Sequence, residues 1–203
     1  MKLLPLIALA VAATTPVFAE ETRQLDAHEH GVGQLDIAFD GKQILMELHA
    51  PGADIVSFEY AAESAEDRAK VDAAIVMLAR PLDLFVLTEA AGCTIVQASA
   101  ELESEEGQAD HEDEHEDHED HEDHDHEDAD HQEKNLGEAG HTEFHAEYLL
   151  ACADPGAVTE ITFTYFDVFP NALEVEVQLI SNKGATSFEV ERDAPTLDLR
   201  GMF

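Results

Sequence analysis

The segment from residue 110 to residue 131 holds the residues whose types and spacing could do chemistry. Of its 22 residues, 21 are Asp, Glu or His, and seven are histidines. Imidazole is the commonest metal ligand at neutral pH, and carboxylates supply further oxygen ligands. We therefore interpret this segment, the His-rich tract, as a metal-collecting surface. Its predicted ligands are His111, His115, His118, His121, His124, His126 and His131.

A solvated acidic linker is the competing interpretation of the His-rich tract. Acidic linkers seldom place a histidine at every third position, as the tract does from His115 to His124, and this spacing favours metal binding. Because the tract is highly charged and almost free of apolar residues, it cannot bury enough surface to offset its ordering entropy. We expect residues 103–140 to form a disordered acidic insertion when no metal is bound.

Ligand softness indicates which metal the tract would collect. Calcium and magnesium prefer oxygen ligands alone, and copper(I) prefers sulfur, whereas the four methionines of the chain are scattered. Zinc fits the imidazole and carboxylate set best, but nickel and copper(II) accept the same ligands and stay open. Because each capture must order flexible backbone, binding should be weak and fast-exchanging, with roughly two or three ions per tract. Protons should compete as the pH falls.

Further histidines lie in segments that should be ordered. His28 and His30 precede a glycine-containing turn, and His141, Glu143 and His145 alternate along a strand, on the solvent face opposite its apolar side. We expect each group to form a metal site that is tighter than the tract, the alternative being that these histidines simply face water. A relay from the loose tract to a firmer site would then be physically sensible.

An enzymatic site is not indicated by these histidines. His141 and His145 have the spacing of a helical zinc-ligand pair, but no Glu directly follows the first histidine, and the segment is strand-like. His49 lies at a strand end, where a hydrogen-bonded structural histidine fits the sequence as well as a ligand does. No glycine-rich phosphate loop, nucleophile elbow or reactive-cysteine motif occurs. We therefore expect no catalytic activity.

The first 19 residues have the pattern of a secretory signal peptide. Lys2 supplies a positive charge, residues 3–13 an apolar stretch too short to span a bilayer, and residues 17–19 a small-residue cleavage signal. No cysteine follows this signal, so a lipid anchor is not expected, and no later apolar run reaches transmembrane length. We expect a soluble, exported, periplasmic protein, with an uncleaved amphipathic anchor as the alternative.

Charge narrows the choice of partners. The chain has a formal net charge of −36, and the part outside the His-rich tract is acidic too. Such a field repels nucleic acid and anionic lipid and concentrates cations, so we expect metal ions as partners and no nucleic acid. The length of residues 20–203 suits a single domain with a real core.

The two cysteines, Cys93 and Cys152, bracket the His-rich tract. In an exported chain they predict a disulfide, because the compartment is oxidising. Both lie in strand-like segments, so we expect a hairpin with Cys93 opposite Cys152 and the tract at its tip. In that register Gln97 would face Tyr148 and Glu101 would face Phe144. Closing so long a loop is worth roughly 4 kcal/mol in the chain-entropy model.

Alternation of apolar and polar residues predicts most of the remaining structure. Ser64 is a helix start of the capping type, and Val71, Ile75 and Leu78 then recur at helical spacing before Pro81. The predicted strands span residues 34–40, 44–48, 84–88, 94–100, 142–151, 159–169, 173–181 and 187–191. We expect an α+β, mostly β fold, in which an antiparallel sheet built from hairpins carries one amphipathic helix.

Several of these segments, taken in order, resemble the ZrgA-like family over essentially the whole mature chain. They are His28 to Gly31, the hairpin from Leu35 to Pro51, Ser57-Phe58-Glu59, the Cys93/Cys152 pair around a His/Asp/Glu insertion, His141 to Tyr148, and Phe166 to Pro170. The resemblance implies a bacterial periplasmic zinc-binding protein that supports an ABC-type zinc importer and its substrate-binding protein. Ser57 departs from the family pattern, in which a glycine often precedes the Phe-Glu pair.

Together these observations predict a periplasmic accessory protein for zinc acquisition. Its His-rich tract would capture zinc and pass it to a component of the importer, such as the substrate-binding protein. The alternative is a passive metal buffer or detoxification protein for zinc, nickel or copper that has no protein partner.

Overall fold

The computed structural model describes residues 29–104 and 141–202. The predicted signal peptide, His28 and the whole His-rich tract lie outside the described residues. None of the helices in the described part is long and apolar enough to cross a membrane.

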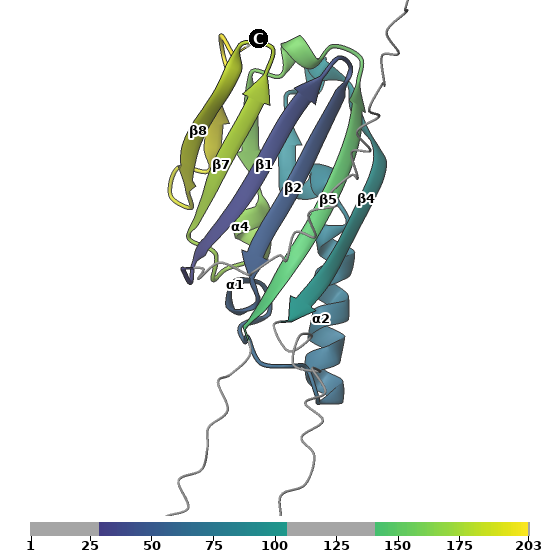
Figure 1. Ribbon diagram of the computed structural model, residues 1–203, viewed down its shortest axis with the longest axis vertical. Helices are drawn as coiled ribbons and strands as arrows, with labels where there is room; N and C mark the ends of the chain where they lie inside the picture. The colour runs from purple at the N-terminus through teal and green to yellow at the C-terminus, as the bar shows by residue number, and fades with distance from the viewer. Residues whose placement is uncertain (1–28, 105–140, 203) are drawn as a thin grey trace, which may run out of the picture.

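A six-stranded sheet forms one layer of the molecule (Figure 1). Its strand order is β4-β5-β2-β1-β7-β8, and all neighbours are antiparallel except β1 and β7, which are parallel. The bounds of its strands are β1 Val32–Asp40, β2 Gln43–Pro51, β4 Cys93–Ser104, β5 Thr142–Cys152, β7 Glu174–Ser181 and β8 Gly184–Glu191.

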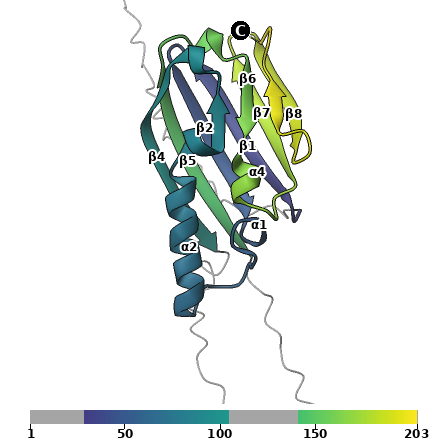
Figure 2. The same cartoon turned by 180° about the vertical axis from the view of Figure 1, so that it is seen from behind.

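The second layer covers one face of this sheet and leaves the other open (Figures 1 and 2). It contains a small antiparallel sheet in the order β3-β6-β9, with β3 Phe85–Leu87, β6 Glu160–Phe163 and β9 Thr196–Asp198. It also contains the helices α1 Gly52–Val56, α2 Ala65–Leu78, α3 Pro81–Leu84 and α4 Tyr165–Val168. The fold is therefore mostly β with short helices, as the sequence predicts.

The first hairpin shows why the two faces of the large sheet differ. Alternate residues of β1 and β2, including Leu35, Ile37, Ile44 and Leu48, are buried against the second layer, while the residues between them face the open side. Because side chains alternate across a strand, this pattern fixes which residues can meet on the open face. That face carries the polar residues described below.

Helix α2 begins and ends where the sequence indicates. The hydroxyl of Ser64 accepts a hydrogen bond from the backbone N–H of Asp67, which satisfies one of the free donors of the first turn. Val71, Ala74 and Leu78 face the core. Burial of this stripe holds the helix along the back of β4 and β5 (Figure 2).

The β4–β5 hairpin confirms the disulfide and corrects the predicted register. Cys93 pairs with Cys152 and is bonded to it. A β-bulge between Ile95 and Gln97 then shifts the pairing by one residue, so Gln97 lies opposite Leu149 and Glu101 opposite His145. The predicted pairs of Gln97 with Tyr148 and of Glu101 with Phe144 are wrong, because a bulge adds a residue to one strand without a sequence signal here.

The segment predicted as a strand over residues 159–169 is instead β6 followed by helix α4. Its β-branched and aromatic residues favour a strand, but tertiary contacts override this preference. The hydroxyl of Thr164 donates to the carbonyl of Leu84, and the guanidinium of Arg192 donates to the carbonyls of Phe166, Phe169 and Ala172. These contacts hold the chain turned back over the sheet.

Candidate metal centre

Two groups of histidines and glutamates in the described part of the chain bring ligand atoms within 4.8 Å of one another around separate centres. The first consists of His30, Glu59 and His141, and we call it the end cluster because it lies where the strands of the large sheet end. The second consists of Glu47, His49 and His145 on the open face of the sheet, and we call it the sheet cluster. A third set, of Glu101 and Glu103, shares His145 with the second.

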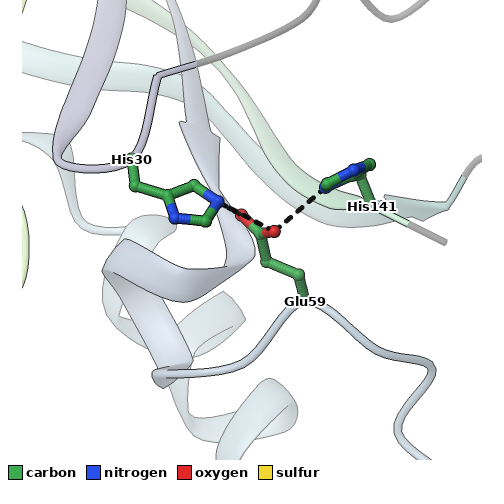
Figure 3. A group of neighbouring side chains, drawn as sticks. All are labelled: His30, Glu59 and His141. Carbon is green, nitrogen blue, oxygen red and sulfur yellow. Dashed lines mark hydrogen bonds and ion pairs between the residues drawn. The ribbon is translucent and has the colours of Figure 1, made fainter. Parts of the chain in front are cut away.

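The end cluster joins three distant segments of the chain (Figure 3). Nε2 of His30 lies 3.0 Å from both carboxylate oxygens of Glu59, and Nδ1 of His141 lies 3.0 Å from one of them, Oε2. The side chains of His30 and His141 are 63% and 52% exposed, whereas that of Glu59 is only 13% exposed. A fixed carboxylate therefore carries two imidazoles that solvent can reach.

Close packing of helix α1 positions this cluster. The backbone N–H of Gly31 donates to the buried carboxylate of Asp54 in α1, which holds the residue next to His30. A Cβ on Gly52 would meet Oγ1 of Thr142 at 2.3 Å, so only glycine lets α1 approach the start of β5. After α1, Ser57 adopts a left-handed conformation with φ of 71° and turns the chain toward Glu59.

The end cluster has the chemistry of an incomplete zinc site. Two imidazole nitrogens and one carboxylate are three of the four ligands that zinc usually takes, and the exposed side of the group leaves room for a fourth. That fourth ligand could be water or a side chain from another segment or protein. The arrangement suits an ion that must enter and leave.

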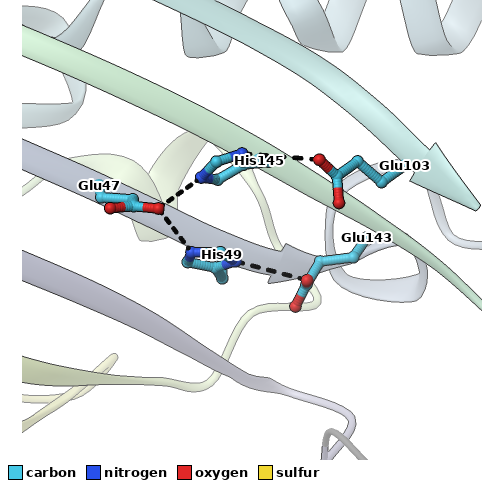
Figure 4. Close-up of polar contacts among 5 residues, drawn as sticks. All are labelled: Glu47, His49, Glu103, Glu143 and His145. Carbon is cyan, nitrogen blue, oxygen red and sulfur yellow. Dashed lines mark hydrogen bonds and ion pairs between the residues drawn. The ribbon is translucent and has the colours of Figure 1, made fainter. Parts of the chain in front are cut away.

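The sheet cluster follows from strand register. His49 on β2 and His145 on β5 are directly paired, and their rings stack with centroids 4.4 Å apart. Glu47 lies two residues before His49 on the same side of β2. Its Oε1 lies 2.8 Å from Nε2 of His145 and 3.3 Å from Nε2 of His49 (Figure 4). Three potential ligands thus converge on one point of the sheet.

Electrostatics favour positive charge within the sheet cluster. The pKa of His49 is raised, chiefly by its contact with Glu143 and, in smaller part, with Glu47. The pKa of Glu47 is lowered, chiefly because its carboxylate accepts a hydrogen bond from His145. The neighbouring pairs Glu47 with Glu147 and Glu103 with Glu143 place like charges opposite each other, which destabilises them in the absence of a cation.

The structure regroups the residues that the sequence singles out. It joins His30 to His141 and separates His141 from His145, which belongs to the sheet cluster. Glu143 lies in neither cluster and contacts His49. The prediction that His145 faces solvent is wrong: the residue is 4% exposed, because side chains of β2 and β4 cover its ring. His28 and the seven histidines of the His-rich tract lie outside the described residues.

Sequence reasoning missed both glutamates that join the histidines. Glu59 stands in a segment quoted only for its family resemblance, and its contacts with His30 and His141 span 29 and 82 residues. Glu47 had a usable signal, because it alternates with His49 and shares its side of the strand. Their pairing with β5 could not be read from spacing alone.

The end cluster lies next to both ends of the hairpin that brackets the His-rich tract. The last pair of the hairpin is Ser104 with Thr142, and His141 immediately precedes Thr142. The chain thus leaves β4 and re-enters β5 beside this cluster (Figure 1).

A comparison with known protein families matches residues 27–199 to the family described as ZrgA family zinc uptake protein. The chain belongs to this family. ZrgA membership indicates a role in zinc uptake, and the matched region contains every residue of both clusters. Zinc is therefore the metal ion to consider at the histidine and glutamate clusters. A comparison with curated proteins finds no match.

Proposed function

We propose that the protein is an exported zinc-binding accessory of a zinc importer. Its His-rich tract captures zinc in the periplasm, the end cluster receives the ion, and a component of an ABC-type importer takes it from there. The tract is the collector, because its seven histidines offer many weak ligands. No step of this role requires catalysis by the protein.

The position of His141 is the observation that carries the proposal. This residue lies 3.0 Å from Glu59 in the end cluster, and it is the first described residue after the gap that contains the tract. An ion held by the last histidines of the tract can therefore reach the end cluster through a short length of chain. The link between collector and receiver is covalent, so the effective concentration of one for the other is high.

The chemistry of ligand exchange supports the same order of events. Each ion bound by the tract must order flexible backbone at about 1 to 2 kcal/mol per residue, which keeps binding weak. The end cluster has a carboxylate fixed by packing and needs less ordering, so zinc should move toward it. Because its imidazoles are exposed and its fourth position is open, ligand groups of a partner can then replace the ligands of the end cluster one after another.

Deletion of residues 110–131 tests the role of the tract. We expect the deleted chain to bind fewer zinc ions than the full chain by about two or three, because about four ligands are needed per ion. Calorimetric titration with zinc measures the stoichiometry, and circular dichroism checks that the fold is retained. The variant Glu59→Gln in the full chain serves as a comparison, because it should remove one ion while the tract keeps its own. An unchanged stoichiometry after deletion would exclude the tract as the collector.

A further inference from the structure

Both imidazoles of the sheet cluster have a carboxylate at each ring nitrogen (Figure 4). At Nδ1, Glu143 lies 3.4 Å from His49 and Glu103 lies 3.8 Å from His145. At Nε2, both rings face the same oxygen of Glu47. A neutral imidazole carries one N–H, so it can donate to one carboxylate and must turn a lone pair toward the other.

In one tautomer the Nε2–H of His145 donates to Glu47 across 2.8 Å, and in the other tautomer the contacts at Glu47 need a cation. If each Nδ1–H donates to its outer carboxylate, two lone pairs and the Glu47 oxygen meet at one point, and all three are electron-rich. A second proton on each ring, or a single divalent metal ion, would make these contacts favourable. We propose that Glu47, His49 and His145 bind one zinc ion, as a site separate from the end cluster and from the His-rich tract.

The distances from the Glu47 oxygen to the two nitrogens are close to those of a tetrahedral ion, and all three ligand atoms lie within 4.8 Å of one another. With zinc bonds of about 2.0 to 2.2 Å, neighbouring ligand atoms of a tetrahedral site lie about 3.3 to 3.6 Å apart. The oxygen of Glu47 lies 3.3 Å from Nε2 of His49 and 2.8 Å from Nε2 of His145. Binding thus asks the carboxylate to move by a few tenths of an ångström and the two stacked rings to open, so that the ion lies near the plane of each ring. Two imidazoles also make this set a better zinc site than Glu101 and Glu103 around Nδ1 of His145.

The outer carboxylates complete the pattern of a histidine zinc site. Histidine ligands of zinc usually donate their other N–H to a carboxylate, which fixes the tautomer and orients the ring. Glu143 stands in this place for His49 at 3.4 Å, and Glu103 lies on the same side of His145 at 3.8 Å, beyond hydrogen-bond distance. They leave Nε2, the nitrogen next to Glu47, as the metal-binding atom of both rings.

An ion can reach the sheet cluster from solvent. The side chains of Glu47 and His49 are 39% and 32% exposed, although that of His145 is only 5% exposed. A cavity of about 100 Å³ opens beside His145, between β4 and β5, and is lined by Glu101 and Glu147 among others. Water can supply the fourth ligand from the exposed side.

Rigid strands should make this site tighter than the end cluster. The backbones of His49 and His145 are paired across β2 and β5 and are ordered before any ion arrives, so binding has only to turn the two stacked rings. The inference rests on the proposed function only for the identity of the ion. It predicts that the first equivalent of zinc enters the sheet cluster and that later equivalents enter the more exposed ligands.

The variant Glu47→Gln in the full chain tests the site. Its amide keeps the shape of the side chain and removes the negative charge. We expect competition with a chromophoric chelator to show that the tightest zinc site of the full chain is weakened more than about tenfold, a loss typical of changes around zinc ligands. Glu189→Gln, an exposed acid on β8 of the same sheet, is the matched control and should leave the affinity unchanged. Glu59→Gln should also leave the tightest site intact.

If Glu47→Gln folds poorly, the wild-type chain can be used to test the site. Histidine ring signals of the full chain, followed by nitrogen NMR, should show Nε2 of His49 and His145 shifting with the first equivalent of zinc. If His30 and His141 respond first and the sheet cluster never responds, its imidazoles are balanced by protons and the site does not exist. Equal affinity in Glu47→Gln and wild type would also overturn it. Deleting residues 110–131 should leave this site intact, so failure of the tract proposal is seen separately.

Discussion

At the scale of single residues, the end cluster and the sheet cluster are each built on one glutamate that lies between two imidazoles. Glu59 has this place in the end cluster and Glu47 in the sheet cluster. The sequence indicates histidines as ligands because they are few outside the tract, but it cannot select two glutamates among 46 acidic residues. The choice is made by contacts between segments up to 98 residues apart, and these depend on the tertiary fold.

Buried tyrosines give a residue-scale prediction for alkaline pH. Tyr165 and Tyr148 are 0% and 3% exposed, and within the described structure their hydroxyls have no hydrogen-bond partner. Burial raises the pKa of both above the ordinary value near 10. Because the folded protein then holds these protons more tightly than the unfolded chain, their contribution to stability is complete below about pH 10 and is lost as the pH rises further.

We expect Tyr165→Phe to make the protein less sensitive to alkali. Above about pH 10 the free energy of unfolding of wild type should fall by about 1.4 kcal/mol per pH unit for each buried tyrosine, and the variant should lose one such contribution. Urea unfolding at about pH 8 and about pH 11 measures the difference. Tyr60→Phe is the control, because Tyr60 is 52% exposed. Parallel losses in wild type and Tyr165→Phe would contradict the assignment.

At the scale of elements, the sequence predicts those helices and strands that are determined by residues close to one another in the chain. The cap at Ser64 and the alternation in β1 and β2 suffice to place α2 and the first hairpin, because both depend on residues near in sequence. The bulge in β4, the helix α4 and the parallel pairing of β1 with β7 escape such reasoning. Each depends on a partner from a remote part of the chain.

The backbone of Ser57 adopts a conformation that is unfavourable for a residue other than glycine, and the cost in stability can be measured. It ends α1 in the left-handed region, which glycine enters freely and other residues enter at about 1 to 2 kcal/mol. Its hydroxyl accepts a hydrogen bond from the side-chain amide of Asn171, which offsets part of that cost. The backbone conformation at position 57 thus favours glycine over other residues.

Two substitutions at Ser57 separate these effects. Ser57→Ala keeps the left-handed strain and removes the hydrogen bond, so we expect it to lower the free energy of unfolding. Ser57→Gly loses the same bond but relieves the strain, and should be more stable than Ser57→Ala by about 1 kcal/mol. Urea unfolding of the three proteins measures both differences. Equal stability of the two variants would show that the left-handed conformation carries no cost.

At the scale of the whole molecule, the candidate metal ligands of the described residues are concentrated on one side and one end of a two-layer fold. The second layer covers the back of the large sheet, so the open face and the strand ends are the surfaces left for ions and partners (Figures 1 and 2). The overall fold class follows from the sequence pattern alone. The division into an end cluster and a sheet cluster does not, because it depends on which strands are neighbours.

Growth of a deletion strain distinguishes an importer accessory from a passive buffer. An accessory should be needed when a chelator makes zinc scarce, since it supplies the importer, and we expect slower growth of the deletion strain in chelator. Complementation with the wild-type chain should restore growth, and the chain lacking residues 110–131 should restore it only in part. A deletion strain that grows normally in chelator but fails in excess zinc would instead identify a buffer.

The place of β1 in the large sheet has a consequence for how the chain folds. This strand comes first in the described sequence but lies in the middle of the large sheet, between β2 and β7. One of its edges therefore stays open until residues 174–181 arrive. A chain that is truncated before β7, or of which β7 has not yet been made, leaves the backbone N–H and C=O groups along one edge of β1 unpaired. Such an edge can pair with other chains. Nearly the full length of the chain must therefore be present before this edge of β1 is covered.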